Sequence, residues 1–436
     1  MIKEKNLSQW LDDLERRHVQ TIQLGLERIT EVATTLDVLN FNAVIITVGG
    51  TNGKGSTVAS LEAIYKQAGY KVATYTSPHL INFNERICVN QKPITDLELI
   101  EAFNIIDKAR GSIALTYFEI ATLAALWHFK QQCLDLIILE VGLGGRLDAV
   151  NCIDADLAII TTVDYDHEDY LGNTLEKIGY EKAGIIRPNK PVIYADENPP
   201  KSILNKAASC EAPVYRKNQE FSYELVDDKI KFSYQNINLT IPQMSFHPNS
   251  IAAALMATFC LKKYLPIKAD SYVDGIKKIK LAGRCQIITK LKRTLLDVAH
   301  NPQAVQYLAH YLKTHYPNVK VHAVFSAFAD KDIIGMIKPL KDVVHFWYPT
   351  LLPGKRAASA NQLISSLAAN DINLNICYNS PFLAYQAACK EAEGHDLIVV
   401  FGSFIIVGAI LSASLNESNY FKNSFSTLRN GYEINN

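Results

Sequence analysis

Short apolar segments alternate in the first half of the chain with stretches whose apolar residues recur every three or four positions. The apolar segments lie at 43–48, 71–76, 135–140, 156–162 and 191–194. Runs without polar alternation are typical of strands buried on both faces, and the helical spacing between them indicates crossover helices. This half of the chain therefore predicts a parallel β-sheet covered by helices, an α/β fold.

The segment 7–40, before the first strand, has the spacing of two helices. Its regularly spaced residues are Leu11, Leu14, His18 and Ile22, then Ile29, Val32 and Leu36. Near residue 221 the pattern changes to alternation of apolar and polar positions, which continues to 241 and predicts an antiparallel excursion. A helix is predicted after it, at 249–263.

A second series of apolar segments begins after Gly283. Its candidate strands are 294–299, 319–326, 343–348, 374–378 and 396–403. Helical stretches separate them, so this series predicts a second, smaller, Rossmann-like α/β domain. We expect domains at 1–283 and 284–436, with substrates meeting in the cleft between them. The polar last dozen residues are expected to form a loose tail.

A glycine-rich turn joins the segment 43–48 to the next helical stretch. It reads GGTNGKGST from Gly49 to Thr57. A strand, a glycine-rich turn and a helix in this order point backbone N–H groups at a polyphosphate, which indicates a P-loop-type ATPase domain. Lys54 would neutralise phosphate oxygens and the Ser56 or Thr57 hydroxyl would reach magnesium. The alternative is a flexible surface turn.

A carboxylate, Glu140, ends the segment 135–140. The carboxyl ends of parallel strands are where open α/β sheets bind ligands, and magnesium prefers oxygen donors. Glu140 is therefore a candidate cation ligand, and an ion pair with Arg146 is the alternative. The glycine-rich loop that follows also contains Asp148.

The next strand leads into an acidic loop, 163–172. Its ionisable residues are Asp164, Asp166, His167, Glu168 and Asp169. Such a cluster at a strand end is suited to metal or phosphate, whereas a solvated loop is the plain alternative. Histidine is an unusual ligand for magnesium, so the spacing leaves metal binding by His167 open.

A helix is predicted at 173–188, capped by Asn173 with Glu176 at its third position and stopped by Pro188. Its apolar face carries Leu175, Ile178, Lys182 and Ile185. An unpaired ammonium on that face is costly. Lys182 either reaches water from the rim of the face, or it has lost its charge or gained an anionic partner.

The composition excludes several classes of protein. Lysine plus arginine and aspartate plus glutamate each number 44, so no basic surface for nucleic acid is expected. The N-terminus has no apolar signal core, and no run of about 18 apolar residues suggests a membrane span. The eight cysteines form no CxxC pair and are expected to be buried thiols. A cytoplasmic enzyme is predicted.

The order of its motifs makes the sequence resemble the Mur-ligase-like superfamily, and within it the bacterial bifunctional dihydrofolate synthase/folylpolyglutamate synthase family. The motifs include LGLERI, GTNGKGST, TSPHLINFNERI, TYFEIATLAAL, EVGLGGRLDAVN, DHEDYLG, EKAGIIRP, HPNSIAAAL, LAGRCQII, LLDVAHNPQA and VVFGS. The resemblance implies an ATP-dependent ligase that adds L-glutamate to dihydropteroate or reduced folates such as tetrahydrofolate. It implies an acyl-phosphate intermediate, with glutamate on the side of the domain 284–436.

The resemblance also implies roles for individual residues. ATP would be bound by Gly50, Thr51, Asn52, Gly53, Lys54, Gly55, Ser56, Thr57, Asn249, Arg284, Asp297 and His300. Magnesium would be held by Ser56, Ser77, Glu140, His167 and Lys182, the last as a carbamate. The pteroate surface would comprise Gly25, Leu26, Thr116, Phe118, Asp148 and Ala149. Lys54, His167 and Lys182 would be the catalytic residues, and ATP, Mg²⁺ and a monovalent cation the small-molecule requirements of a monomeric enzyme.

Two alternatives remain. A peptidoglycan Mur ligase belongs to the same superfamily, but such enzymes usually place a nucleotide-sugar domain before the phosphate loop, and here the loop begins at Gly49. A P-loop regulatory ATPase would not need two α/β domains with an acidic, lysine-bearing site. Glutamate-dependent phosphate release separates a ligase from such a switch.

Overall fold

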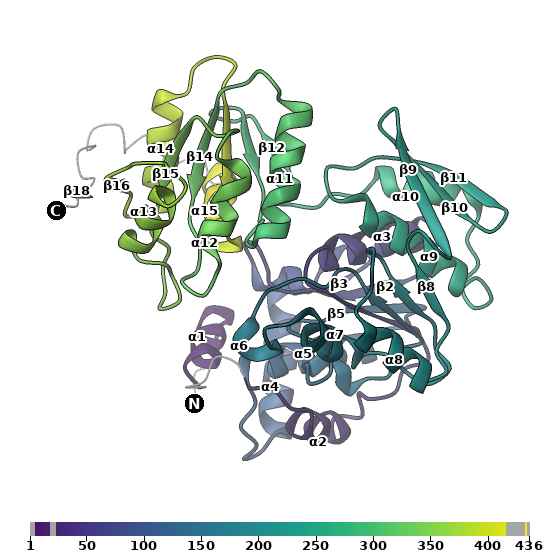
Figure 1. Cartoon of the computed structure of the whole chain (residues 1–436). Coiled ribbons are helices and arrows are strands. Elements are labelled where there is room, and N and C mark those ends of the chain that lie inside the picture. The colour runs from purple at the N-terminus through teal and green to yellow at the C-terminus, as the bar shows by residue number, and fades with distance from the viewer. Residues whose placement is uncertain (1–4, 18–22, 416–431, 434–436) are drawn as a thin grey trace. The chain divides into compact units, whose positions relative to one another are not determined.

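The computed structural model describes residues 5–17, 23–415 and 432–433. The chain divides into two compact units, Met1–Lys280 and Leu281–Asn436. Each unit has its own main sheet and helices (Figure 1). The predicted fold class, two α/β units, is confirmed. His18 and Ile22, and most of the expected C-terminal tail, lie outside the described residues.

An eight-stranded sheet forms the centre of the first unit, in the order β4-β3-β2-β5-β1-β6-β7-β8. The strands β2, β5, β1, β6, β7 and β8 are parallel, whereas β3 and β4 pair antiparallel at one edge. The strands are β1 Val44–Gly49, β2 Val72–Tyr75, β3 Ile87–Val89, β4 Lys92–Pro93, β5 Leu136–Glu140, β6 Leu157–Ile160, β7 Val192–Tyr194 and β8 Val214–Arg216. The five predicted strands are present, and β3, β4 and β8 were not predicted.

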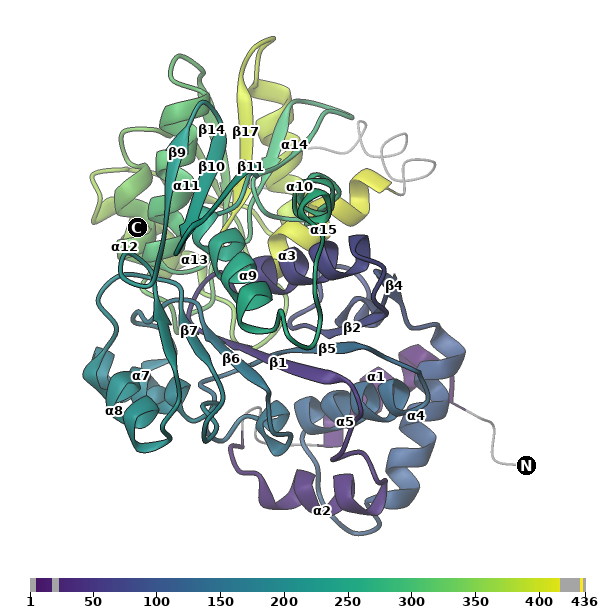
Figure 2. The ribbon, with the colours of Figure 1, turned by 90° about the vertical axis from the view of Figure 1, so that its right-hand side faces the viewer.

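Helices cover both faces of this sheet. Figure 2 shows α3, α9 and α10 on one face of β1 and β5, and α2, α4 and α5 on the other. The helices are α1 Leu7–Arg17, α2 Glu27–Thr35, α3 Lys54–Gln67, α4 Asp96–Ala109, α5 Tyr117–Lys130, α6 Glu168–Leu171, α7 Leu175–Ala183, α8 Lys201–Ser209, α9 Pro248–Cys260 and α10 Ala269–Lys277. Because both faces are covered, every residue of β5 and β6 is buried.

The predicted antiparallel excursion is present as a separate three-stranded sheet. Its strands are β9 Phe221–Val226, β10 Lys229–Tyr234 and β11 Ile237–Pro242. Phe221 and Phe232 are buried on one face, and the Phe232 ring stacks on Phe259 of α9 at 5.9 Å between centroids. The excursion therefore packs on the helix that follows it in sequence.

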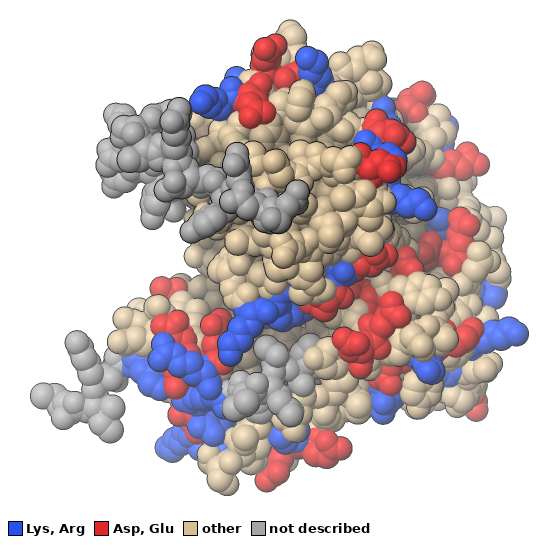
Figure 3. All heavy atoms as spheres, turned by 60° about the vertical axis from the view of Figure 1, so that its left-hand side comes forward, with Lys and Arg blue, Asp and Glu red and all other residues tan. Residues whose placement is uncertain are grey.

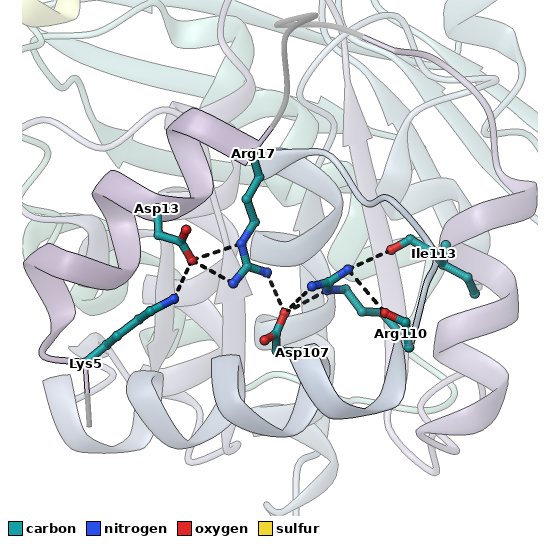
Figure 4. A network of polar contacts seen from close by, with 7 residues as sticks. Lys5, Asp13, Arg17, Asp107, Arg110 and Ile113 are labelled. Atoms are coloured by element: carbon teal, nitrogen blue, oxygen red, sulfur yellow. Dashed lines mark hydrogen bonds and ion pairs between the residues drawn. The ribbon is translucent and has the colours of Figure 1, made fainter. Parts of the chain in front are cut away.

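An ionic network attaches α1 to α4 (Figure 4). Arg17 donates hydrogen bonds to Asp13 within α1 and to Asp107 of α4, and Arg110 donates to the same Asp107. Beside it, the ring of Trp10 lies against Phe103, with centroids 5.8 Å apart. The described part of the N-terminal segment is thus fixed by both apolar and charged contacts.

The second unit contains a five-stranded sheet in the order β12-β13-β17-β14-β15, with β12 antiparallel to the rest. The strands are β12 Gln286–Ile288, β13 Thr294–Leu296, β14 Val321–Phe325, β15 Phe346–Pro349 and β17 Leu397–Phe401. The helices are α11 Pro302–His315, α12 Ile333–Ile337, α13 Ala360–Ala368, α14 Pro381–Glu391 and α15 Phe404–Leu415. The predicted strand at 374–378 is reduced to β16 Ile376–Cys377, which pairs with β18 Tyr432–Glu433. Within the described residues, its contact with the main sheet is a single parallel bridge between Tyr378 and Thr350, just after β15.

Acidic and basic side chains are intermixed on the face of the molecule shown in Figure 3. Among the described residues, no helix is long and apolar enough to cross a membrane.

Candidate active site

The phosphate loop lies between β1 and α3. Gly53, with a φ of 86°, precedes the first residue of the helix, Lys54. The Lys54 ammonium folds back over the loop and donates to the carbonyls of Gly50 at 3.0 Å and Thr51 at 3.1 Å. This arrangement leaves the N-terminus of α3 at the carboxyl end of β1, as expected for phosphate binding.

Two threonines that sequence reasoning missed hold this loop in place. The Thr162 hydroxyl accepts from the Asn52 amide at 2.9 Å, and the Thr161 hydroxyl donates to the Asn52 carbonyl at 2.6 Å. A side chain at Gly50 would collide with Thr161, because its Cβ would lie 1.8 Å from Thr161 Oγ1. The signal in the sequence was a pair of threonines at the end of a buried strand.

Glu140 lies beside the phosphate loop. Strands β1 and β5 are neighbours, with Val48 opposite Glu140. The Glu140 carboxylate accepts from the Ser77 amide at 3.1 Å, and a Cβ on Gly55 would be 3.7 and 3.8 Å from its two oxygens. The structure thus brings Ser77, Glu140 and the first turn of α3, which contains the buried Ser56, together. Arg146, the alternative partner, pairs with Glu181 instead.

Lys182 lies inside the protein, with only 3% of its surface exposed. The expectation that it shares the buried face of its helix is confirmed, and the alternative of a lysine reaching water from the rim is wrong. Its pKa is lowered to about 7, first by burial and then by the positive charge of Lys54, while Asp166 opposes the shift. Lys182, Lys54 and Asp166 are therefore electrostatic neighbours.

The expected cap of the Lys182 helix is wrong. Thr174, not Asn173, caps α7 by accepting from the Lys177 amide at 3.3 Å. The Glu176 carboxylate does not complete a capping box, because it accepts from the Lys201 and Ser202 amides at the start of α8. The helix ends at Ala183, before Pro188.

His167 precedes the short helix α6 in a left-handed conformation, with a φ of 54°. Its amide donates to Asp166 at 2.9 Å, and its ring Nε2 lies 3.9 Å from the same carboxylate. Through Asp166, His167 is placed near Lys182. Within the described ranges no three His, Cys, Asp or Glu side chains form a metal-binding group, so a cation here would also need hydroxyl or carbamate oxygens.

The six residues expected to contact pteroate lie on three segments of the first unit that meet. The Gly25 amide donates to the Leu147 carbonyl at 3.4 Å, next to Asp148 and Ala149. The Phe118 ring would lie 2.6 Å from a Cβ on Gly142. Leu26 precedes α2 and Thr116 caps α5. An ion pair joins these two helices, because Arg28 of α2 lies 3.0 Å from the buried Glu119 of α5.

Asp148 is buried among these segments. It accepts from the Leu143 amide at 2.8 Å and the Val150 amide at 3.1 Å. Burial raises the pKa of its carboxyl to about 6, against the lowering effect of these amides and of Lys54. The charge of Lys54 thus acts on both Lys182 and Asp148.

Asn249, the second residue of α9, lies next to the phosphate loop. The hydroxyl of its neighbour Ser250 donates to the Gly53 carbonyl at 3.3 Å. Asn249 itself is buried and hydrogen-bonded to Tyr223. Neither Ser250 nor Tyr223 was predicted.

Arg284, Asp297 and His300 lie near one another in the second unit. Asp297 follows β13 and accepts from the Cys285 and Ala299 amides, each at 2.8 Å. Burial raises the pKa of Asp297, and Arg284 opposes the shift. The Phe404 ring, which was not predicted, lies 5.3 Å from the Arg284 guanidinium and 6.0 Å from the His300 ring.

The sequence matches two family models, the Mur ligase middle domain at 48–262 and the Mur ligase, glutamate ligase domain at 283–404. It is 42% identical over 405 residues to the dihydrofolate synthase/folylpolyglutamate synthase of Escherichia coli K12, covering 93% of this chain and 94% of that protein. The chain belongs to the dihydrofolate synthase/folylpolyglutamate synthase family. It is therefore an ATP-dependent ligase, and the family predicted from its motifs is confirmed.

Solved structures agree with this assignment. E. coli FolC in complex with DHPP and ADP superposes with a TM-score of 0.89 at 41% identity, covering 94% of this chain and 97% of that one. A bifunctional folylpolyglutamate synthase/dihydrofolate synthase with Mn, AMPPNP and L-glutamate bound superposes with a TM-score of 0.87 at 38% identity, covering 94% and 98%. Neither alternative, the peptidoglycan ligase or the regulatory ATPase, is the family to which this chain belongs.

Proposed function

We propose that this ligase adds L-glutamate both to dihydropteroate and to reduced folates, using one site in the first unit for the two acids. The observation that carries the proposal is the position of Lys54. Its charge acts both on Lys182 and on Asp148, a residue of the expected pteroate surface. A phosphate bound by the loop would therefore be close to an acid bound near Asp148.

In the first step an oxygen of the substrate carboxylate attacks the γ-phosphorus of ATP. A phosphorus–oxygen bond forms, the bond to ADP breaks, and the product is an acyl phosphate. In the second step the amine of glutamate attacks the acyl carbon, phosphate leaves with its bridging oxygen, and the nitrogen loses a proton. Phosphoryl transfer of this kind depends mainly on positioning and positive charge.

The chain itself supplies much of that charge. The Lys54 ammonium and the first-turn N–H groups of α3 face the region where phosphate would bind. When phosphate oxygens replace the Gly50 and Thr51 carbonyls as acceptors, the Lys54 ammonium gains a charged partner. Charge-assisted hydrogen bonds are stronger than neutral ones, so this exchange favours the bound nucleotide.

The donors next to this lysine fit Mg²⁺. Glu140 offers a carboxylate, and Ser56 and Ser77 lie within the same cluster, so hard oxygen donors converge. We propose that these residues, with His167 and a carbamate on Lys182, hold the metal. Bound there, Mg²⁺ would neutralise the charge that develops on the phosphoryl oxygens.

The remaining assignments follow the resemblance. We assign Gly50 to Thr57 and Asn249 to ATP, and Gly25, Leu26, Thr116, Phe118, Asp148 and Ala149 to the pteroate group. Nucleotide contacts by Arg284, Asp297 and His300 stay predictions. So do glutamate binding by the second unit, the monomeric state, a monovalent cation and the cytoplasmic location.

The test is an assay with ATP, Mg²⁺ and L-glutamate in which dihydropteroate and tetrahydrofolate are offered separately. We expect both acids to give glutamylated products by mass spectrometry, each with glutamate-dependent phosphate release. Product from only one acid would reduce the proposal to a single activity. Phosphate release that is slow and independent of glutamate would contradict it.

A further inference from the structure

The side-chain amide of Asn249 is held from two sides by residues outside the phosphate loop. The Tyr223 hydroxyl donates to Asn249 Oδ1 at 2.7 Å, and Asn249 Nδ2 lies 3.5 Å from Asp196 Oδ1. We propose that Tyr223 is a positioning residue for nucleobase recognition, which with Asp196 fixes the orientation of the Asn249 amide and thereby makes the enzyme prefer ATP over GTP. The inference rests on the proposed contact between Asn249 and the nucleotide.

The fold delivers Tyr223 to this position through the antiparallel excursion. Tyr223 lies opposite Phe232 in the β9–β10 pair and therefore shares the face that packs on α9. Because Asn249 is at the start of α9, the same packing that buries Phe221 and Phe232 carries the Tyr223 hydroxyl to the amide. The β9–β11 sheet thus positions Tyr223 beside Asn249, which its alternating sequence pattern does not indicate.

The tyrosine ring is itself immobilised. The Lys217 ammonium lies 5.2 Å from the centre of the Tyr223 ring, and the same ammonium pairs with Glu197 at 3.3 Å. Only 12% of the Lys217 side chain is exposed, so the cation–π contact is largely shielded from water. The hydroxyl is therefore presented to Asn249 from a fixed ring.

The two contacts together select one of the two orientations of the amide. If the amide turned over, its oxygen would face the Asp196 carboxylate and its NH₂ group would face the Tyr223 hydroxyl. An amide oxygen cannot donate a hydrogen bond to a carboxylate, so the turned form would lose one contact and bring two acceptors together. The observed orientation still leaves one lone pair on Oδ1 and one N–H on Nδ2.

These two remaining groups match adenine and not guanine. The N6 amino group of adenine donates and its N7 accepts, so an asparagine with one free acceptor and one free donor can bind both. Guanine has O6 and N7 at the same edge, which are both acceptors. One of them would meet the Oδ1 of an amide that cannot turn, and the base would be rejected.

The experiment compares Tyr223→Phe with Tyr234→Phe. Tyr234 belongs to β10 of the same excursion and accepts from Gln235, so its variant loses a hydroxyl without touching Asn249. We expect Tyr223→Phe to raise KM for ATP about tenfold, the typical effect of one lost hydrogen bond in a binding site. The kcat should be unchanged, and the ATP-to-GTP ratio of kcat/KM should fall by a similar factor. Tyr234→Phe should match the wild type in all three.

An Asn249→Ala variant separates the inference from its premise. If Asn249→Ala raises KM for ATP and Tyr223→Phe adds nothing further in that background, the positioning role is supported. If Asn249→Ala raises KM but Tyr223→Phe alone leaves both KM and nucleotide selectivity unchanged, the role of Tyr223 is overturned while the nucleotide contact stands. If Asn249→Ala leaves KM unchanged, the nucleotide contact is wrong and the inference fails with it.

Discussion

Lys182 and Lys54 are close enough for the positive charge of Lys54 to lower the pKa of the buried Lys182 ammonium. Two ammonium groups in one partly desolvated site repel each other, which is unfavourable unless anions offset them. The phosphates of ATP would offset the charge of Lys54, and a carbamate would remove that of Lys182. This relationship underlies the first three predictions.

Substitution of Lys54 should stop catalysis without unfolding the protein. In Lys54→Ala the ammonium that bridges the Gly50 and Thr51 carbonyls is lost, and with it a preorganised positive charge. The rate of product formation should fall by about 10²–10³ or more. Lys66→Ala, on the exposed end of the same helix, is the matched control and should retain normal turnover. A folded Lys54→Ala enzyme with near-normal activity would rule out the phosphate-loop assignment.

Lys182 should carry a carbamate in the active enzyme. Carbamylation requires a neutral amine, and burial of Lys182 favours that form. We expect ¹³C-labelled bicarbonate to give a carbamate resonance that is absent from Lys182→Ala. That variant should lose most ligase activity, and short carboxylates should restore part of it. A labelled wild-type enzyme without the resonance, or a fully active alanine variant, would show that the lysine is not modified.

The stability of the unmodified protein should depend on pH through Lys182. The pKa of Lys182 is lowered from 10.5 to about 7 in the folded protein, so between these values the unfolded chain binds more protons. The free energy of unfolding should therefore rise with pH across this window. In CO₂-free buffer, denaturant titrations at pH 7 and about pH 9 should show this rise in the wild type. The rise should be smaller in Lys182→Met. An equal dependence of the unfolding free energy on pH in the two proteins would contradict the shifted pKa of Lys182.

Much of this architecture follows from local patterns. Buried apolar runs predicted β1, β2, β5, β6 and β7, because a strand covered on both faces has few polar positions. The edge strands β3 and β4 are short and partly exposed, so the same pattern could not reveal them. The run 374–378 was predicted as a strand of the second sheet, but only Tyr378 bridges to the end of β15, and the strand itself pairs with β18. Pairing across such a distance in sequence leaves no local signal.

The residues of the site also fall into those that the sequence could predict and those that it could not. Glu140 ends a strand and Lys54 follows a glycine-rich turn, and both are places where a chemical role can be read from sequence. Asn173 and Thr174 are both good caps, and only the position of the first helical turn decides between them. Tyr223 contacts Asn249 across 26 positions of sequence, so nothing near either residue indicates the contact.

Replacement of Glu140 should lower the affinity of the site for Mg²⁺ specifically. In Glu140→Gln the carboxylate that accepts from Ser77 loses its charge, and a hard cation loses its anionic oxygen donor. We expect the Mg²⁺ concentration for half-maximal activity to rise about 10- to 100-fold, with nucleotide binding in the absence of metal unchanged. Asp169→Asn, at an exposed acid of the short helix α6, should behave like the wild type. Equal Mg²⁺ dependence in the two variants would exclude Glu140 as a ligand.

The proposed mechanism depends on the formation of an acyl phosphate. It is tested most directly with dihydropteroate whose carboxylate oxygens are labelled with ¹⁸O. The enzyme is incubated with this acid, ATP, Mg²⁺ and L-glutamate, and the released phosphate is analysed by mass spectrometry. Attack of the carboxylate on ATP predicts that each phosphate released carries one ¹⁸O atom from the acid. Release of unlabelled phosphate alongside glutamylated product would contradict the acyl-phosphate mechanism.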